Sequence, residues 1–199
     1  MKDIRICITA GRPLKRLLLI VFVIIFQLFA VSCSDDFAPY EEKSYDISKA
    51  VSGNIYVVSQ IEPQISAIAA KYSDKAKLYY AEYTFNDKDS GEVLFAYKNN
   101  YTKGSTGYTE LVDVYVDMQS KTAVKVEYTN GHAKRVSGYG SAYIGSKNTD
   151  ARELYLKHIS KATEQADVKK LTITYSNDEV LINCYDSDGR QVYHDKLAQ

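Results

Sequence analysis

Alternation of apolar and polar residues is the feature that most constrains how this chain can fold. In VKVEY, residues 124–128, three apolar side chains would point to one side of an extended strand and two charged ones to the other. The same period, in segments rich in Tyr, Val and Thr, predicts four strands at residues 77–85, 92–98, 109–117 and 122–129. Turn-forming residues at 86–91 and 119–121 separate neighbouring strands. We therefore expect an antiparallel sheet with one buried and one wet face.

A helix is predicted before these strands. Apolar residues recur at intervals of three and four between Ile55 and Tyr72, which is typical of one helical face. Pro63 interrupts the pattern. The helix therefore either begins near Pro63 or extends from about Asn54 with a kink at the proline.

The second half of the chain repeats the order of helix and strands. Asp150 and Glu153 have capping-box spacing, and an apolar stripe from Leu154 to Ala162 follows them. Three short strands are then expected, at residues 171–175, 180–185 and 191–194. Residues 131–148, which contain four of the ten glycines, form the connection between the two halves.

This order predicts an α+β fold in which a helix packs on an antiparallel sheet, with two tandem helix-plus-sheet units as one form of it. The first unit would span residues 49–130 with four strands, and the second residues 131–199 with three strands. We expect the two to pack as one globule.

The first unit resembles the PepSY-like domains of exported bacterial proteins. The segments that carry the resemblance are QISAIAAKY, residues 64–72, and VYVDMQSKTAVKVEY, residues 114–128, with a Tyr-Val-Asp, turn and strand ending. The turn has Ser120-Lys121-Thr122 where that family usually has a glycine. The resemblance implies a noncatalytic fold of the kind found in protease propeptides and inhibitory or regulatory modules.

Residues 1–32 have the features of an export signal: five basic residues and then the apolar run LLLIVFVIIFQLFA. That run is short for a membrane-spanning helix, which needs about 20 apolar residues. The following AVSC segment resembles the lipobox of bacterial lipoproteins, which implies that Cys33 is acylated and becomes the mature N-terminus. The alternative is a chance cysteine behind a plain signal peptide or signal anchor.

The residues after the cysteine, Ser34, Asp35 and Asp36, resemble the export tag of Bacteroidota surface lipoproteins. We therefore expect a protein held in the outer membrane by a lipid such as palmitate, at the cell surface in preference to the periplasmic face. Two or three acyl chains would anchor it durably, because each buried methylene contributes about 0.8 kcal/mol. The acidic, polar segment 33–48 is expected to be a flexible tether.

Without the leader, the chain has 20 Lys and Arg residues against 24 Asp and Glu residues. Nucleic acid is excluded as an expected partner, because its phosphates demand clustered positive charge. Cys184 is left without an intramolecular partner once Cys33 is acylated, so the domain must fold without a disulfide. Its alternation with Val180 and Ile182 indicates a buried, small hydrophobic residue.

Catalytic templates do not fit the sequence, and we expect neither catalytic residues nor a cofactor. The segment GSAYIGSK, residues 140–147, has Ser and Lys in the reverse of the order that a phosphate loop requires. Ser105 and Ser141 lack the nucleophile elbow Gly-x-Ser-x-Gly. Asp113 and Asp117 would be about 13 Å apart along a strand, beyond the separation of paired glycosidase carboxylates.

No metal site is expected either. The clusters Asp87/Asp89 and Asp186/Asp188 lie beside glycines, but Lys88 and Cys184 occupy positions where a calcium loop needs oxygen ligands, so hairpin turns explain both. The three histidines have no local ligand spacing, and we expect His158 to complete a helix face.

All 18 tyrosines follow the leader. Tyr101, Tyr108, Tyr139 and Tyr143 lie in polar connectors where no apolar face requires them, and these are the candidate contact residues. The leading hypothesis is a membrane-anchored, noncatalytic module that binds a protein or peptide through sheet edges and these tyrosines, as an inhibitor or accessory subunit. Carbohydrate or small-ligand binding is the alternative, and an enzyme of unfamiliar design is the third hypothesis.

Overall fold

A computed structural model describes residues 40–140, 142–177 and 179–198 of the chain. Within these residues it has eight strands: β1 (Tyr40–Ala50), β2 (Lys77–Phe85), β3 (Gly91–Lys103), β4 (Thr106–Asp117), β5 (Thr122–His132), β6 (Lys170–Tyr175), β7 (Glu179–Tyr185) and β8 (Gln191–Ala198). It also has two helices, α2 (Val58–Ala69) and α3 (Ala151–Thr163). All seven strands predicted from the alternation are present.

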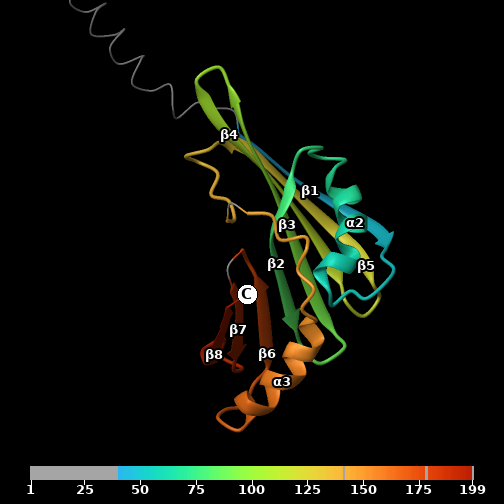
Figure 1. The fold of residues 1–199 in the computed structure, drawn as a ribbon, viewed down its shortest axis with the longest axis vertical. Helices are drawn as coiled ribbons and strands as arrows, with labels where there is room; N and C mark the ends of the chain where they lie inside the picture. Colours follow the sequence, from blue (N-terminus) through green and yellow to red (C-terminus); the bar gives the residue numbers. More distant parts are fainter. Residues whose placement is uncertain (1–39, 141, 178, 199) are drawn as a thin grey trace, which may run out of the picture. The chain divides into compact units, whose positions relative to one another are not determined.

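The strands form one antiparallel sheet in the order β1-β5-β4-β3-β2-β6-β7-β8. The pairing of β2 with β6, from Ala81 opposite Tyr175 to Phe85 opposite Leu171, joins the strands of the two halves. It involves only one end of β2, and Figure 1 shows β6, β7 and β8, in red, beside that end.

The predicted fold class, a helix-packed α+β fold with two tandem units as one form, is wrong. Of the residues that the structure describes, 49% are in strands and 16% are helical, and all of these strands belong to the same eight-stranded sheet, so the fold is close to all-β. The sequence pattern identified seven of the eight described strands and both helices, but not which strands pair. Antiparallel pairing of β2 with β6 merges what would otherwise be two small sheets, and this long-range contact leaves no local signal.

The expected tether also needs correction. Of residues 33–48, those that the structure describes belong to β1, which pairs with β5 from Tyr40 opposite Gly131 to Ala50 opposite Thr122. Only Tyr45 and Ile47 in β1 are even half-buried, so the segment has the polar composition of a tether although its backbone is paired. Its charged side chains and the irregular pairing between Asp46 and Lys49 suit a strand at the edge of a sheet.

Strands β3 and β4 extend beyond their predicted ends. The predicted strands stop at Lys98 and begin again at Thr109, yet the hairpin continues to the pair Lys103 and Thr106. Residues 99–103 are polar apart from Tyr101, so the apolar alternation ends before the backbone pairing does. Gly104, with a φ of 65°, forms the turn in a conformation that favours glycine.

The two helices show different degrees of agreement with expectation. Helix α3 is capped as predicted, because the Asp150 side chain accepts hydrogen bonds from the backbone N–H groups of Arg152 and Glu153. Helix α2 begins at Val58 and contains Pro63 in its second turn, which differs from both predicted starts.

Both helices pack on the same face of the sheet. Phe85 packs against Tyr155 of α3, with ring centroids 4.8 Å apart, and the hydroxyl of Tyr83 donates to the carbonyl of Ile55 just before α2. Tyr83 and Phe85 are two residues apart in β2 and therefore point to one side. A single cluster of buried side chains fills the space between the helices and this face, and it includes Ile65 from α2 and Leu154 from α3.

The connection between β5 and α3 runs along the part of β2 that β6 does not pair with. The N–H of Ile144 donates to the carbonyl of Leu78 at 3.0 Å, and the N–H of Ala151 donates to the carbonyl of Tyr56 at 2.9 Å. These bonds satisfy backbone groups that no strand reaches, and they fix the path by which the connection approaches α3.

Candidate functional site

The face of the sheet opposite the helices is covered by neither helix. Along β4, Val114 points into the core, while its neighbours Asp113 and Tyr115 point to the other side. The pairing register assigns further side chains to this side, which we call the open face: Tyr80, Glu82, Thr84, Leu94, Ala96, Lys98, Leu111, Asp113, Tyr115, Lys125, Glu127, Thr172, Thr174, Leu181 and Asn183. Tyrosines, leucines and carboxylates thus occur together on a face that would ordinarily be polar.

Tyr139, from the connection between β5 and α3, packs onto the middle of the open face. Its ring stacks on Tyr80 with centroids 4.7 Å apart, and its hydroxyl donates to the Asp113 carboxylate at 3.0 Å. The ammonium of Lys98 donates to the Tyr139 carbonyl at 2.7 Å. A Cβ atom added at Gly138 would lie 2.9 Å from Cε of Lys98, so the Lys98 side chain packs closely against the backbone of this connection.

Asp113 lies largely buried under this contact. Burial raises the pKa of its carboxyl to about 6, the Tyr139 hydroxyl opposes that rise, and Glu127 on the neighbouring strand adds to it. One carboxylate oxygen, Oδ1, is buried without a hydrogen-bond partner among the described residues. A carboxyl group in this environment is more easily protonated than an exposed one.

Other tyrosines of the open face are held by carboxylates. The hydroxyl of Tyr80 donates to Glu82 at 2.6 Å, and the hydroxyl of Tyr115 donates to Glu127 at 2.8 Å. Lys125 pairs with Glu127 at 3.0 Å and lies 3.9 Å from the centre of the Tyr115 ring. These contacts restrain the rings before any partner arrives, which lowers the entropy lost on binding.

The four tyrosines chosen from the sequence lie in three places. Tyr101 and Tyr108 are cross-strand partners in β3 and β4, with rings stacked 5.4 Å apart. Tyr139 is on the open face, and Tyr143 is 48% exposed beside Glu62 of α2. The four therefore do not converge on one site.

Two cavities include members of this set. The first, of about 300 Å³, is lined by Tyr40, Glu41, Tyr101, Lys103, Tyr108 and Asn130. The second, of about 370 Å³, is lined by Glu62, Ser66, Ala70, Asp74, Ala76, Lys77 and Tyr143. Only the first brings two of the predicted tyrosines together.

The sequence reasoning missed Tyr80 and Tyr115 as contact candidates. A signal for them was present: each lies in a strand, at a position that the alternation assigns to the wet face, two residues from a carboxylate in Glu82 or Asp113. Residues i and i+2 of a strand share a face, so this spacing places ring and carboxylate side by side.

Cys184 and His158 lie inside the fold. Cys184 is fully buried, as predicted, and burial raises the pKa of its thiol to about 11. His158 is buried on α3, as predicted, and its Nδ1 lies 3.0 Å from the Tyr193 hydroxyl and 3.4 Å from Asp195. Burial lowers the pKa of His158, although Asp195 opposes this. A buried, protonated thiol is a poor nucleophile.

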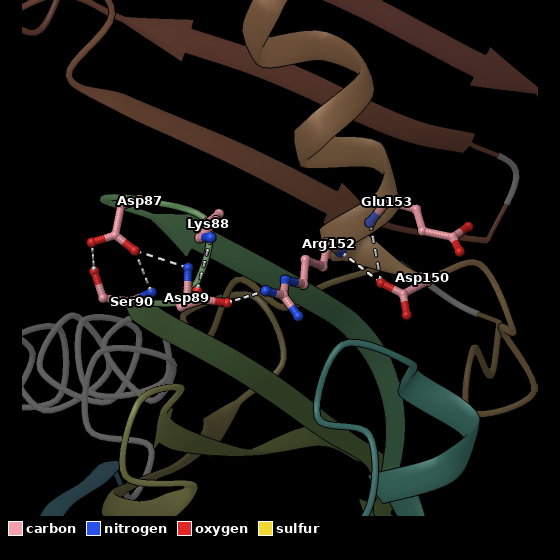
Figure 2. A network of polar contacts seen from close by, with 7 residues as sticks. All are labelled: Asp87, Lys88, Asp89, Ser90, Asp150, Arg152 and Glu153. Carbon is pink, nitrogen blue, oxygen red and sulfur yellow. Dashed lines mark hydrogen bonds and ion pairs between the residues drawn. The ribbon is translucent and has the colours of Figure 1, made fainter.

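The acidic cluster between β2 and β3 serves the turn. Figure 2 shows the Asp87 carboxylate accepting hydrogen bonds from the backbone N–H groups of Asp89 and Ser90, both at 2.8 Å, and from the Ser90 hydroxyl at 2.7 Å. Donation by Asp89 is the largest of the effects that lower the pKa of Asp87. Arg152, at the start of α3, forms an ion pair with Asp89, so the same turn also holds the helix.

The second acidic cluster has the same role. Asp186 accepts from the backbone N–H groups of Asp188 and Arg190, both at 2.9 Å. Among the residues that the structure describes, no group of three or more His, Cys, Asp or Glu side chains is placed to hold a metal ion. The absence of a metal, a cofactor and a catalytic residue stays a prediction.

The membrane-anchor residues, Cys33 with Ser34, Asp35 and Asp36, lie outside the described part of the chain. Within that part, neither helix has the length and apolar character needed to cross a bilayer.

Comparisons with known proteins add little. No family model matches the chain, and no curated protein matches it. A solved structure, an acyl-ACP thioesterase from Bacteroides thetaiotaomicron, aligns over 80% of this chain and 97% of its own, with 7% sequence identity and a TM-score of 0.20. A score this low carries no argument about fold or activity.

Proposed function

We propose that this chain is a lipid-anchored, noncatalytic interaction module, inhibitory or accessory, whose open face binds a protein or peptide partner. The observation that carries the proposal is the composition of this face, where tyrosine and leucine side chains are half-exposed on a sheet that helices cover on the other side only. Aromatic and aliphatic side chains that stay partly exposed among polar ones are typical of a binding site.

The charges of the open face favour a partner of particular chemistry. Glu82 and Glu127 place carboxylates on two strands of this face, with Lys98 and Lys125 beside them. A partner that presents arginine or lysine together with an aromatic or aliphatic anchor would complement this surface. Because salt screens the attraction between these charges and those of the partner, we expect the association rate to fall as ionic strength rises.

Photo-crosslinking tests the proposed surface. Benzoylphenylalanine in place of Leu111, on the open face, should form an adduct with the partner in cell envelopes. The same substitution at Leu156 is the matched control, because this residue is a 52% exposed leucine on α3, which packs on the opposite face. Adducts from Leu156 but not from Leu111 would contradict the assignment of the open face.

The anchor is tested separately. Cys33→Ser should abolish acylation and release the protein from the membrane, measured by palmitate labelling and by mass spectrometry of the N-terminus. Labelling that persists in this variant would overturn the anchor without bearing on the open face.

A further inference from the structure

We propose that the cavity lined by Tyr40, Glu41, Tyr101, Lys103, Tyr108 and Asn130 binds a single saccharide ring. This site lies at the end of the sheet where the β3–β4 hairpin turns, and it is distinct from the open face. The inference shares one element with the proposed function, the lipid anchor at Cys33, and is otherwise independent of it.

The cavity has an aromatic wall. Tyr101 and Tyr108 face each other across β3 and β4, with centroids 5.4 Å apart and ring planes 18° apart. His132 packs edge-on against Tyr108 at 6.2 Å and supports it. Each ring turns one face to the other, and the restrained pair offers the cavity aromatic surface that suits a ligand with an apolar face of its own.

Hydrogen-bond donors and acceptors both lie around this wall. Glu41 accepts hydrogen bonds and Lys103 donates them, while Asn130 can do both. The Tyr101 hydroxyl donates to Asn130 Oδ1 at 3.0 Å, and this bond orients the amide. Hydroxyl groups both donate and accept, so a polyhydroxylated ring can satisfy all three side chains.

The same side chains disfavour other ligand classes. Glu41, which forms an ion pair with Lys43, and Lys103 give this lining charges of both signs, so neither an anion nor a cation meets a lining of purely opposite charge. A purely apolar ligand would bury these polar groups without partners. The volume, about 300 Å³, is at the lower end for small-molecule sites and fits one ring better than an extended chain.

The place of the cavity in the chain suggests where the saccharide is found. Tyr40 and Glu41, the first two described residues, line it, and Tyr40 is 42% exposed. Seven residues on from Cys33, Tyr40 can be at most about 25 Å from the acylated sulfur, because an extended chain spans about 3.6 Å per residue. An anchored protein would therefore hold the cavity close to the membrane surface, within reach of glycolipid headgroups as well as free oligosaccharides.

Binding is measured with the full-length protein in detergent micelles, by calorimetry against methyl glycosides of glucose, galactose, mannose and N-acetylglucosamine. We expect saturable binding to at least one of them, weakened roughly tenfold or more by Tyr108→Ala, which removes half of the aromatic wall. Tyr101→Phe keeps the stack and loses only the bond to Asn130, so it should weaken binding less. Tyr143→Ala, at the second cavity, is the matched control and should leave binding unchanged.

A second arm identifies the source of the saccharide. Phosphatidylethanolamine vesicles with and without lipopolysaccharide are compared as ligands for the Cys33→Ser variant, which lacks the lipid. Binding that requires lipopolysaccharide and is lost in Cys33→Ser/Tyr108→Ala assigns the site to a glycolipid headgroup, whereas binding of methyl glycosides alone assigns it to free saccharides.

The proposal is overturned if neither ligand binds, or if Tyr143→Ala abolishes binding and Tyr108→Ala and Tyr101→Phe do not. Either result leaves the partner test at Leu111 unaffected, so the two proposals fail separately. Thermal unfolding of each variant shows whether a loss of binding reflects a loss of fold.

Discussion

Tyr83 and Tyr80 lie three residues apart in β2 and point to opposite faces of the sheet. Tyr83 is fully buried, and its hydroxyl donates to the backbone carbonyl of Ile55 at 3.0 Å. Tyr80 is half-exposed, and its hydroxyl donates to the Glu82 carboxylate at 2.6 Å. A buried carbonyl has no other donor available, whereas a half-exposed carboxylate can exchange its donor for water or a ligand. The same residue type therefore stabilises the fold on one face and leaves the other available for binding.

Truncation on the covered face should have the largest effect. Tyr83→Ala removes a ring that packs against Phe95 and Tyr175 and leaves a cavity, so we expect a loss of about 3–5 kcal/mol in the free energy of unfolding. Urea denaturation measures this loss. Tyr115→Ala on the open face is the control and should lose much less, because solvent already reaches the Tyr115 ring. Equal losses would mean that the two faces do not differ as described.

Asp113 should make stability depend on pH. Its folded-state pKa, about 6, is above the unfolded value of 3.8, so the protonated form is favoured by folding. The resulting stability is fully present below about pH 4 and is lost as pH rises through 6, amounting to at most about 3 kcal/mol. Urea denaturation at pH 5 and pH 7.5 measures it.

Asp113→Asn is the matched variant, because its amide resembles the neutral carboxyl and can still accept from Tyr139. The variant should be more stable than the natural protein at pH 7.5, and its stability should vary less between the two pH values. An unchanged pH profile would mean that another group carries the dependence.

How far the sequence could predict these features depends on their range. Local alternation predicted both ends of β2 correctly, and it placed Asp113 in a strand with its side chain away from the core. The burial of Asp113 could not be predicted, because the covering ring, Tyr139, is 26 residues away and its contact depends on the path of the connection to α3. Strand β1 was missed for a similar reason. Its backbone is paired with β5 across more than 70 residues, and its polar side chains give no sign of this.

Tyr139→Ala should have an intermediate effect and should alter the titration of Asp113. The substitution removes a stacked ring and a hydrogen bond from a partly exposed position, so we expect a loss of about 1–2 kcal/mol. Water would then reach Asp113, and its pKa should fall toward the ordinary range, which NMR titration of the carboxyl measures. A pKa that stays near 6 in this variant would mean that the strands alone, without Tyr139, bury the carboxyl.

Removal of single hydroxyl groups gives the smallest effects and the most direct comparison of the two faces. Tyr83→Phe leaves the Ile55 carbonyl buried without its donor and should reduce the free energy of unfolding by about 1–2 kcal/mol. Tyr80→Phe leaves Glu82 with the Thr174 hydroxyl, at 3.1 Å, and with access to solvent, so we expect less than about half of that loss. Both changes delete one oxygen from the same strand and keep both rings, so their difference in chemical denaturation isolates the hydrogen-bond partner from packing. If Tyr80→Phe were the more destabilising of the two, the hydrogen bond to Glu82 would contribute mainly to the stability of the fold. The tyrosines of the open face would then be explained by stability better than by binding.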